Sequence, residues 1–140
     1  MRTSAAGSKH GPALVRGFTL LELLVVVALI SALERDATRL AALLETARAQ
    51  ARASGLPVVW RSTPTGFVFE GLPPPGLPQR WLSEATRTTA SQPVVLGPEP
   101  LIPPQSIALT PAQGPSLTLW VSSDGLRPFR VQRSPEWTKP

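Results

Sequence analysis

Few residues in this sequence are of the types that catalyse reactions. The 140 residues contain no cysteine, no tyrosine and one histidine, His10. Cysteine nucleophiles and thiolate zinc sites are therefore excluded, and a Ser-His-Asp or histidine-bound zinc site has only that one histidine to draw on. The carboxylates of the C-terminal part are scattered singly: Glu70, Glu84, Glu99, Asp124 and Glu136. No glycine-rich phosphate loop is present, and we expect no enzyme activity, no metal site and no cofactor.

A group of arginines near the C-terminus is a candidate nucleic-acid contact. Arg127, Arg130 and Arg133 lie on and beside a strand predicted over residues 129–131. Phosphate contacts from three arginines would give salt-sensitive, largely non-specific binding. The same residues are also typical of a solvated edge strand that charge protects from aggregation. Both interpretations remain open at the level of sequence.

Glu22 lies within an apolar run, residues 18–33, in which 13 of 16 residues are apolar. The run is apolar on every face, which favours a membrane helix over a helix in the core of so short a chain, although about 20 residues normally cross the hydrocarbon. Arg2, Lys9 and Arg16 precede it and account for three of the five net positive charges. The positive-inside rule therefore predicts a cytoplasmic N-terminus.

The carboxylate of Glu22 has two explanations. Inside a membrane helix it costs a few kcal/mol, and such residues are usually paired or functional. Near a helix start it is also favoured by the helix dipole and reached by water among the headgroups. Position along the chain is compatible with either.

The segment RGFTLLELLVV, residues 16–26, resembles the N-terminal cleavage and methylation motif of type IV prepilins and type II secretion pseudopilins. The resemblance implies that prepilin peptidase cuts between Gly17 and Phe18 on the cytoplasmic side and N-methylates Phe18. The mature chain would then have 123 of the 140 residues and no histidine. The resemblance also implies that Glu22 pairs with the N-terminal amine of a neighbouring subunit and sets the stagger in the filament. When a carboxylate and an ammonium group are buried as a pair, their attraction offsets the cost of removing each charge from water, which either one alone would pay in full.

An amphipathic segment is predicted to continue the apolar run as one helix. Apolar residues recur every three or four positions and form one stripe: Leu33, Ala37, Leu40, Leu44, Ala47 and Ala51. Charged residues are expected on the other faces: Arg35, Asp36, Arg39, Glu45, Arg48 and Arg52. Ser54-Gly55 followed by Pro57 predicts the helix end. The whole helix, residues 18–54, would be about 55 Å long.

Short strands are predicted beyond Gly55. The candidates are residues 58–60 and 67–69, joined by a turn at 63–66, followed by 93–96, 107–109, 117–121 and 129–131. Ser123-Asp124-Gly125 supplies a turn between the last two. We expect one small antiparallel sheet packed on the second half of the helix. Its core would include Trp60, Trp81, Trp120 and Phe69.

These patterns together predict an α+β fold with a long N-terminal helix, its first half embedded in the membrane, on a small antiparallel sheet, and the resemblance to prepilins implies that this fold is pilin-like. The expected segments are a cleaved basic leader (1–17), a transmembrane and assembly helix (18–33), an amphipathic helix (34–55) and a β-rich periplasmic domain (56–140). The charged residues that begin at Glu34 arrive earlier than in the pilin family.

Residues 40–51 and 55–58 resemble the helix-to-first-strand region of the protein H family of minor pseudopilins. The resemblance implies a single-pass protein of the bacterial inner membrane, with its C-terminal domain in the periplasm. It would assemble with other pseudopilins into the type II secretion pseudopilus. The competing hypothesis is a minor type IV pilin that binds DNA for uptake through Arg127, Arg130 and Arg133.

Overall fold

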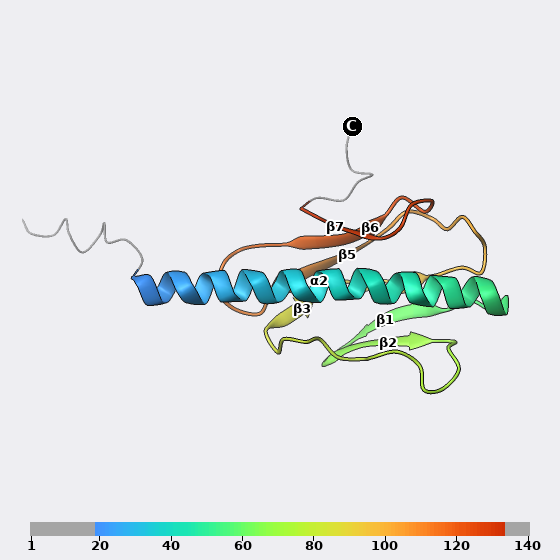
Figure 1. The fold of residues 1–140 in the computed structure, drawn as a ribbon, viewed down its shortest axis with the longest axis horizontal. Helices are drawn as coiled ribbons and strands as arrows, with labels where there is room; N and C mark the ends of the chain where they lie inside the picture. The colour runs from blue at the N-terminus through green and yellow to red at the C-terminus, as the bar shows by residue number, and fades with distance from the viewer. Residues whose placement is uncertain (1–18, 134–140) are drawn as a thin grey trace, which may run out of the picture.

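One long helix runs the length of the structure, a computed structural model that describes residues 19–133 (Figure 1). This helix, α2, spans Leu20–Ser54. Its C-cap is Gly55, whose φ of 73° is the left-handed conformation that glycine adopts without strain. The predicted unbroken helix is confirmed from Leu20 onward, and Phe18 lies outside the described residues.

Seven strands follow within the described part of the chain: β1 (Val59–Thr63), β2 (Gly66–Glu70), β3 (Thr86–Thr88), β4 (Val94–Val95), β5 (Gln105–Pro111), β6 (Leu119–Ser123) and β7 (Arg130–Gln132). They form two antiparallel sheets, ordered β2-β1-β4 and β3-β5-β6-β7, so the prediction of a single sheet was wrong. All six predicted strands are present in the predicted order, but the structure has a seventh, β3, which was missed. Its sequence, Thr-Arg-Thr, carries no apolar pattern, and the segment becomes a strand by pairing with β5.

The β1–β2 hairpin requires a glycine, Gly66, directly after its turn. Thr63 pairs with Gly66 across Pro64 and Thr65. Gly66 also forms an isolated bridge with Arg80. A side chain at Gly66 would clash with the carbonyl oxygen of residue 79, so only glycine allows the chain to pass so close.

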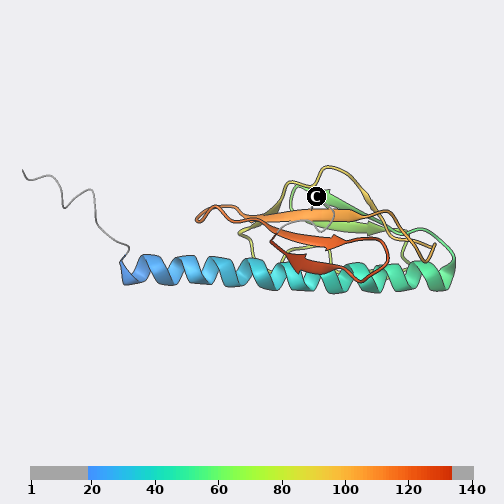
Figure 2. The same ribbon diagram turned by 90° about the horizontal axis from the view of Figure 1, so that it is seen from above.

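The helix packs on the four-stranded sheet, in contact with β3, β5, β6 and β7. The two views show both sheets gathered along its C-terminal part (Figures 1 and 2). One apolar cluster joins the helix to both sheets and includes Leu40, Trp60 and Val121. All six residues of the predicted stripe are buried. Of the four aromatic residues expected in the core, Trp60 and Phe69 are buried, and Trp81 and Trp120 are half-buried.

Two of the charged residues expected on the outer faces of the helix are buried instead. Asp36 is 1% exposed and Arg48 is 2% exposed. At about 100° of rotation per residue, both positions lie roughly 60° from the centre of the apolar stripe, on opposite sides of it. They therefore border the packed face, and each is covered by a loop of the β domain.

The carboxylate of Asp36 holds the segment that enters β3. Its Oδ1 accepts a hydrogen bond from the backbone N–H of Leu82 at 2.7 Å, and its Oδ2 accepts from that of Ser83 at 3.1 Å. The Thr86 hydroxyl donates to Oδ2 at 2.6 Å. Three donors thus satisfy a carboxylate that burial alone would destabilise.

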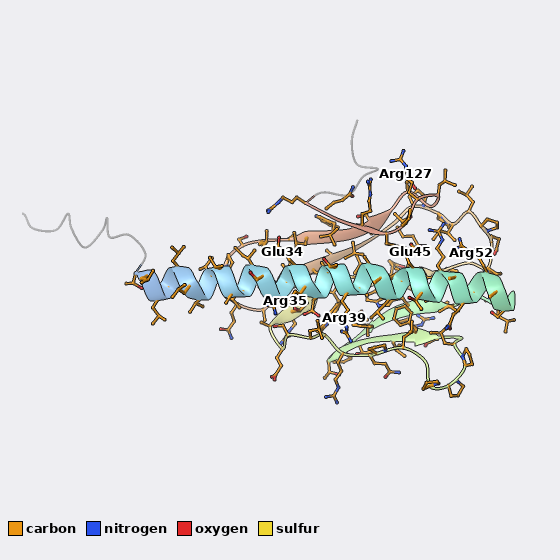
Figure 3. All side chains as sticks on the ribbon, viewed as in Figure 1. Glu34, Arg35, Arg39, Glu45, Arg52 and Arg127 are labelled. Carbon is orange, nitrogen blue, oxygen red and sulfur yellow. The ribbon has the colours of Figure 1, made fainter. Side chains whose placement is uncertain are left out.

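Arg48 holds the loops at the other end of the domain through hydrogen bonds from its guanidinium group. Its guanidinium donates to three carbonyl oxygens: Gly125 at 2.7 Å, Pro100 at 3.1 Å and Arg127 at 3.3 Å. Glu45 lies 3.7 Å from it and also accepts from the backbone N–H of Phe129 at 2.9 Å. Figure 3 shows Glu45 on the side of α2 that faces β6 and β7. The two buried charges therefore bind separate loops to one helix.

The Asp36→Ala substitution should lower the free energy of unfolding by about 2–4 kcal/mol, because three donors lose a charged acceptor in a buried place. Glu34→Ala is the matched control. Glu34 is an exposed carboxylate on the same helix, and its loss should change stability by less than about 0.5 kcal/mol. Urea unfolding in mild detergent, followed by tryptophan fluorescence, measures both. Equal stability of the two variants would contradict the role given to Asp36.

Candidate functional site

The start of α2 is closed by a reciprocal pair of hydrogen bonds. Thr19 is extended, with φ −73° and ψ 162°, and its hydroxyl accepts from the backbone N–H of Glu22 at 3.1 Å. The Glu22 carboxylate accepts from the backbone N–H of Thr19 at 3.3 Å. This capping box satisfies two donors that the helix leaves unpaired. Of the two explanations for Glu22, the helix-start role is therefore realised in the structure.

The capping role of Thr19 was not predicted, although the sequence carries its signal. A Thr followed three residues later by Glu, ahead of an apolar run, is the ordinary signature of a capping box. The carboxylate of Glu22 also remains accessible, because the residue is exposed. Only its Oε1 atom is engaged in the cap. Its Oε2 atom has no hydrogen-bond partner among residues 19–133, so Glu22 can hold the cap and bind a second group at once.

The first two turns of α2 after the cap expose large apolar side chains on several faces. Their exposed fractions range from 50% to 73%, for Leu20, Leu21, Leu23, Leu24, Val25 and Val27. Both ribbon views show this part of the helix projecting beyond the strands (Figures 1 and 2). The β5–β6 loop meets the helix at Leu29, which lies against Gly114. One helix thus has an uncovered apolar part and a part packed on the domain.

In residues 19–133 no helix is both long enough and apolar enough to span a membrane.

Gly17 and Phe18, the residues of the predicted cleavage and methylation site, lie outside the described residues. The description begins at Thr19, two positions after Gly17. Their roles therefore remain predictions from the sequence. The same holds for the basic residues of the predicted leader, Arg2, Lys9 and Arg16.

The C-terminal arginines lie along one connection and one edge strand. Arg127 is in the β6–β7 loop, Arg130 begins β7 opposite Ser122, and Arg133 follows β7. All three are exposed. Because β7 is the outer strand of the four-stranded sheet, the placement matches the solvated edge that was one of the two interpretations.

Asp124 lies among these arginines and makes the segment less basic than its sequence suggests. Its Oδ1 accepts from the backbone N–H groups of Arg127 at 2.8 Å and Leu126 at 2.9 Å. The Arg127 side chain lies 3.6 Å from Oδ2. The N–H of Arg127, that of Leu126 and the charges of Arg127 and Arg130 lower the pKa of Asp124 below its ordinary 3.8. Arg133 is not part of this group.

No arrangement of three or more His, Cys, Asp or Glu side chains that could hold a metal ion occurs between residues 19 and 133. The buried carboxylate of Asp36 and the buried guanidinium of Arg48 are both occupied by loop groups. In the structure both residues fix loops, whereas Glu22, the apolar side chains at the start of α2 and the three C-terminal arginines are exposed.

The ionised form of Asp124 is stabilised by folding, because its pKa is lowered in the native loop. Wild type should therefore be more stable than Asp124→Asn above about pH 4, and this advantage should disappear as the pH falls through the lowered native pKa. Thermal unfolding at a series of pH values tests this. The control is Glu99→Gln, an exposed carboxylate whose removal should leave no such pH-dependent difference. An NMR titration of Asp124 with a midpoint at or above 3.8 would contradict the assignment.

Comparison with known families finds a match at the start of the chain. Residues 13–33 match the family described as the prokaryotic N-terminal methylation motif. No curated protein and no solved structure gives a significant match. The matched segment contains Gly17, Phe18 and Glu22 and includes the start of α2, up to Leu33. The chain therefore carries a prepilin-type methylation motif on a long helix packed against antiparallel sheets, which is a type IV pilin-like architecture.

Proposed function

We propose that the protein is a minor pseudopilin, a structural subunit rather than an enzyme, of the pseudopilus of a type II secretion system. The observation that carries the proposal is the continuity of the methylation motif with a half-covered helix. The motif, residues 13–33, includes the exposed apolar turns of α2. The same helix is packed on the β domain from Leu33 to Ala51.

The two parts of this helix require different environments. Its apolar start needs a non-aqueous partner, because large exposed apolar patches on a soluble protein mark sites of interaction. In the proposal, that partner is first the inner membrane and then the helices of other pseudopilins in the filament. The domain is carried in the periplasm as a rigid body, because the buried stripe and the Asp36 and Arg48 contacts hold it to the helix.

Glu22 is the proposed assembly residue. Its Oε1 atom accepts from Thr19 in the cap, and its Oε2 atom is available to the methylated amine of a neighbouring Phe18. An amine that meets an ionised carboxylate among apolar side chains is held strongly, since neither charge is tolerated there alone. The capping box would hold the carboxylate at the N-terminal end of its helix, where the amine of a neighbouring subunit could reach it.

Assignment to the protein H family rests on the resemblance of residues 40–51 and 55–58 and remains a proposal. The competing function, DNA uptake through Arg127, Arg130 and Arg133, is supported by the exposure of all three residues. It is weakened by Asp124, which engages Arg127 and lies close enough to Arg130 to be influenced by its charge. We therefore favour the filament subunit.

The Gly17→Leu substitution should abolish processing, because a large side chain before the cut bond would not fit the position that glycine takes in the motif. Co-expression with prepilin peptidase and mass spectrometry of the intact chain measures this. Wild type should shorten from 140 to 123 residues and gain one methyl group. Gly11→Leu, a glycine of the same leader, is the control and should be processed normally. Normal processing of the Gly17 variant would refute the cleavage site.

Glu22→Gln separates the two roles of Glu22. Glutamine keeps the capping box but carries no charge, so the helix should form normally while incorporation into the filament falls at least tenfold. Glu34→Gln removes an exposed charge from the same helix and should leave incorporation unchanged. Crosslinking of sheared filaments, with the other pseudopilins co-expressed, measures incorporation. Incorporation of Glu22→Gln at the wild-type level would show that capping alone explains the residue.

A further inference from the structure

Four arginines surround two shallow grooves at the end of the β domain nearest the exposed apolar turns. Arg35 and Arg39 belong to α2, Arg80 precedes the Asp36-bound loop, and Arg87 is in β3. We call these four residues the arginine collar. Leu82, 62% exposed, lines both grooves. One groove, of about 530 Å³, contains Arg35 and Arg39, and the other, of about 630 Å³, contains Arg80 and Arg87.

None of the collar arginines has a carboxylate within ion-pair distance among residues 19–133. Elsewhere on the surface, by contrast, Arg61 pairs with Glu70 at 2.7 Å. Three collar side chains bond only backbone carbonyls: Arg35 to Ser31 at 3.4 Å, Arg39 to Arg80 at 2.8 Å, and Arg87 to Glu84 at 2.6 Å and Thr86 at 2.8 Å. The collar therefore presents positive charge that the domain itself does not neutralise.

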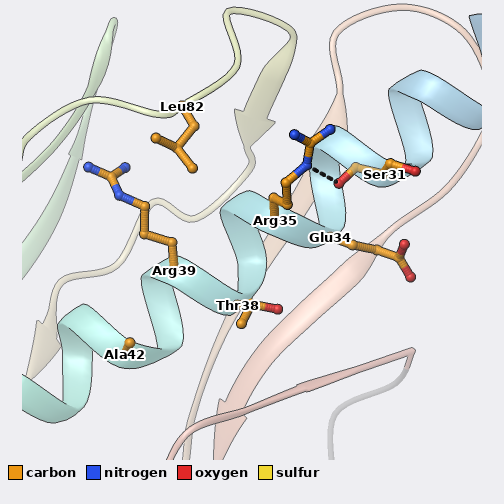
Figure 4. Close-up of a pocket in the computed structure, with 7 residues that line it drawn as sticks. All are labelled: Ser31, Glu34, Arg35, Thr38, Arg39, Ala42 and Leu82. Atoms are coloured by element: carbon orange, nitrogen blue, oxygen red, sulfur yellow. Dashed lines mark hydrogen bonds between the residues drawn. The ribbon is translucent and has the colours of Figure 1, made fainter.

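The close-up of the first groove shows how these charges are displayed. The guanidinium groups of Arg35 and Arg39 extend on either side of Leu82, toward the same side of the helix (Figure 4). Glu34 extends away from them. Glu84 lines the second groove, and the buried carboxylate of Asp36 accepts from the backbone N–H of Leu82. The collar therefore keeps a positive excess of one when all three carboxylates are counted. An apolar side chain flanked by arginines suits the boundary between lipid headgroups and hydrocarbon.

The collar stands at a fixed distance from the exposed apolar turns, because one unbroken helix joins them. Arg35 is eight residues, about 12 Å, beyond Val27. The β5–β6 loop meets the helix at Leu29, six residues or about 9 Å before Arg35. If the apolar turns enter a membrane, the collar lies at the level of the headgroups. Arg52 and Arg127 lie toward the opposite end of the domain (Figure 3).

We propose that the arginine collar binds the phosphate groups of anionic lipids, and so seats the β domain on the membrane surface before assembly. The inference rests on the proposed anchoring of α2. An anionic membrane is favoured over a nucleic acid because the charges surround an exposed leucine and share one end of the molecule with six exposed apolar residues. Each arginine that reaches such a surface strengthens binding roughly fivefold.

The test is partition of the full chain, diluted from detergent, into vesicles of phosphatidylcholine alone or with one quarter phosphatidylglycerol. Wild type should bind the anionic vesicles at least tenfold more strongly, and this increment should largely vanish in 0.5 M salt, which screens exposed charges. The triple variant Arg35→Gln, Arg80→Gln and Arg87→Gln should lose most of the increment but keep its binding to neutral vesicles. Arg39 is retained because it bonds the backbone of Arg80.

A second triple variant, Arg52→Gln, Arg127→Gln and Arg130→Gln, removes the same charge from the far end and should keep the increment within twofold. Glu84→Gln should enlarge it. The basic residues before residue 18 are common to all these proteins and cancel in the comparison. Circular dichroism of each variant verifies that α2 is intact.

The outcomes separate this inference from the proposed function. Failure of wild type to bind neutral vesicles would overturn the anchoring itself. Binding to neutral vesicles with no anionic increment, or with an increment lost equally in both triple variants, would overturn the collar alone. Loss of duplex DNA binding in the collar variant, with lipid binding unchanged, would reassign these arginines to a nucleic acid.

Discussion

One helix, α2, both anchors the β domain and exposes its own apolar first turns, and the rest of the structure depends on this division. From Leu33 to Ala51 the apolar stripe is buried against the β domain, mainly its four-stranded sheet. From Leu20 to Val27 the apolar side chains are uncovered. Because backbone hydrogen bonds continue without a break through α2, the domain cannot move independently of the exposed turns. The partner that covers these apolar turns therefore also fixes the position of the β domain.

Buried charges make this attachment specific as well as strong. An apolar stripe alone would tolerate small rotations or shifts of the helix against the sheets, because the hydrophobic effect is not directional. Asp36 and Arg48 each accept or donate three loop hydrogen bonds at opposite ends of the packed segment. Gly125 shows how tightly one of these loops is folded, since any side chain there would clash with the carbonyl oxygen of Ile102. The two ends together determine the register of helix and domain.

The charged surface has two distinct parts, which the overall charge of +5 conceals. The arginines beyond β6 accompany Asp124, which accepts the N–H of Arg127 and interacts with its side chain. At the other end, Arg35, Arg39 and Arg87 of the collar bond only carbonyl oxygens. A cation bound to a carbonyl keeps its full charge, whereas one beside a carboxylate is largely neutralised. Position on the fold, and not the number of arginines, therefore decides which end attracts an anionic surface.

The sequence by itself determined the helix, its stop at Gly55, the hairpin at residues 63–66 and the methylation motif, because each depends on residues close together in the chain. It also carried the Thr19–Glu22 cap, whose partners are three residues apart. Only the tertiary structure decided that the strands divide into two sheets and that Thr86–Thr88 is one of them, since pairing with β5 supplies what local pattern lacks. The burial of Asp36 and the gathering of Arg35, Arg39, Arg80 and Arg87 likewise required the fold, because their partners lie more than 40 residues apart.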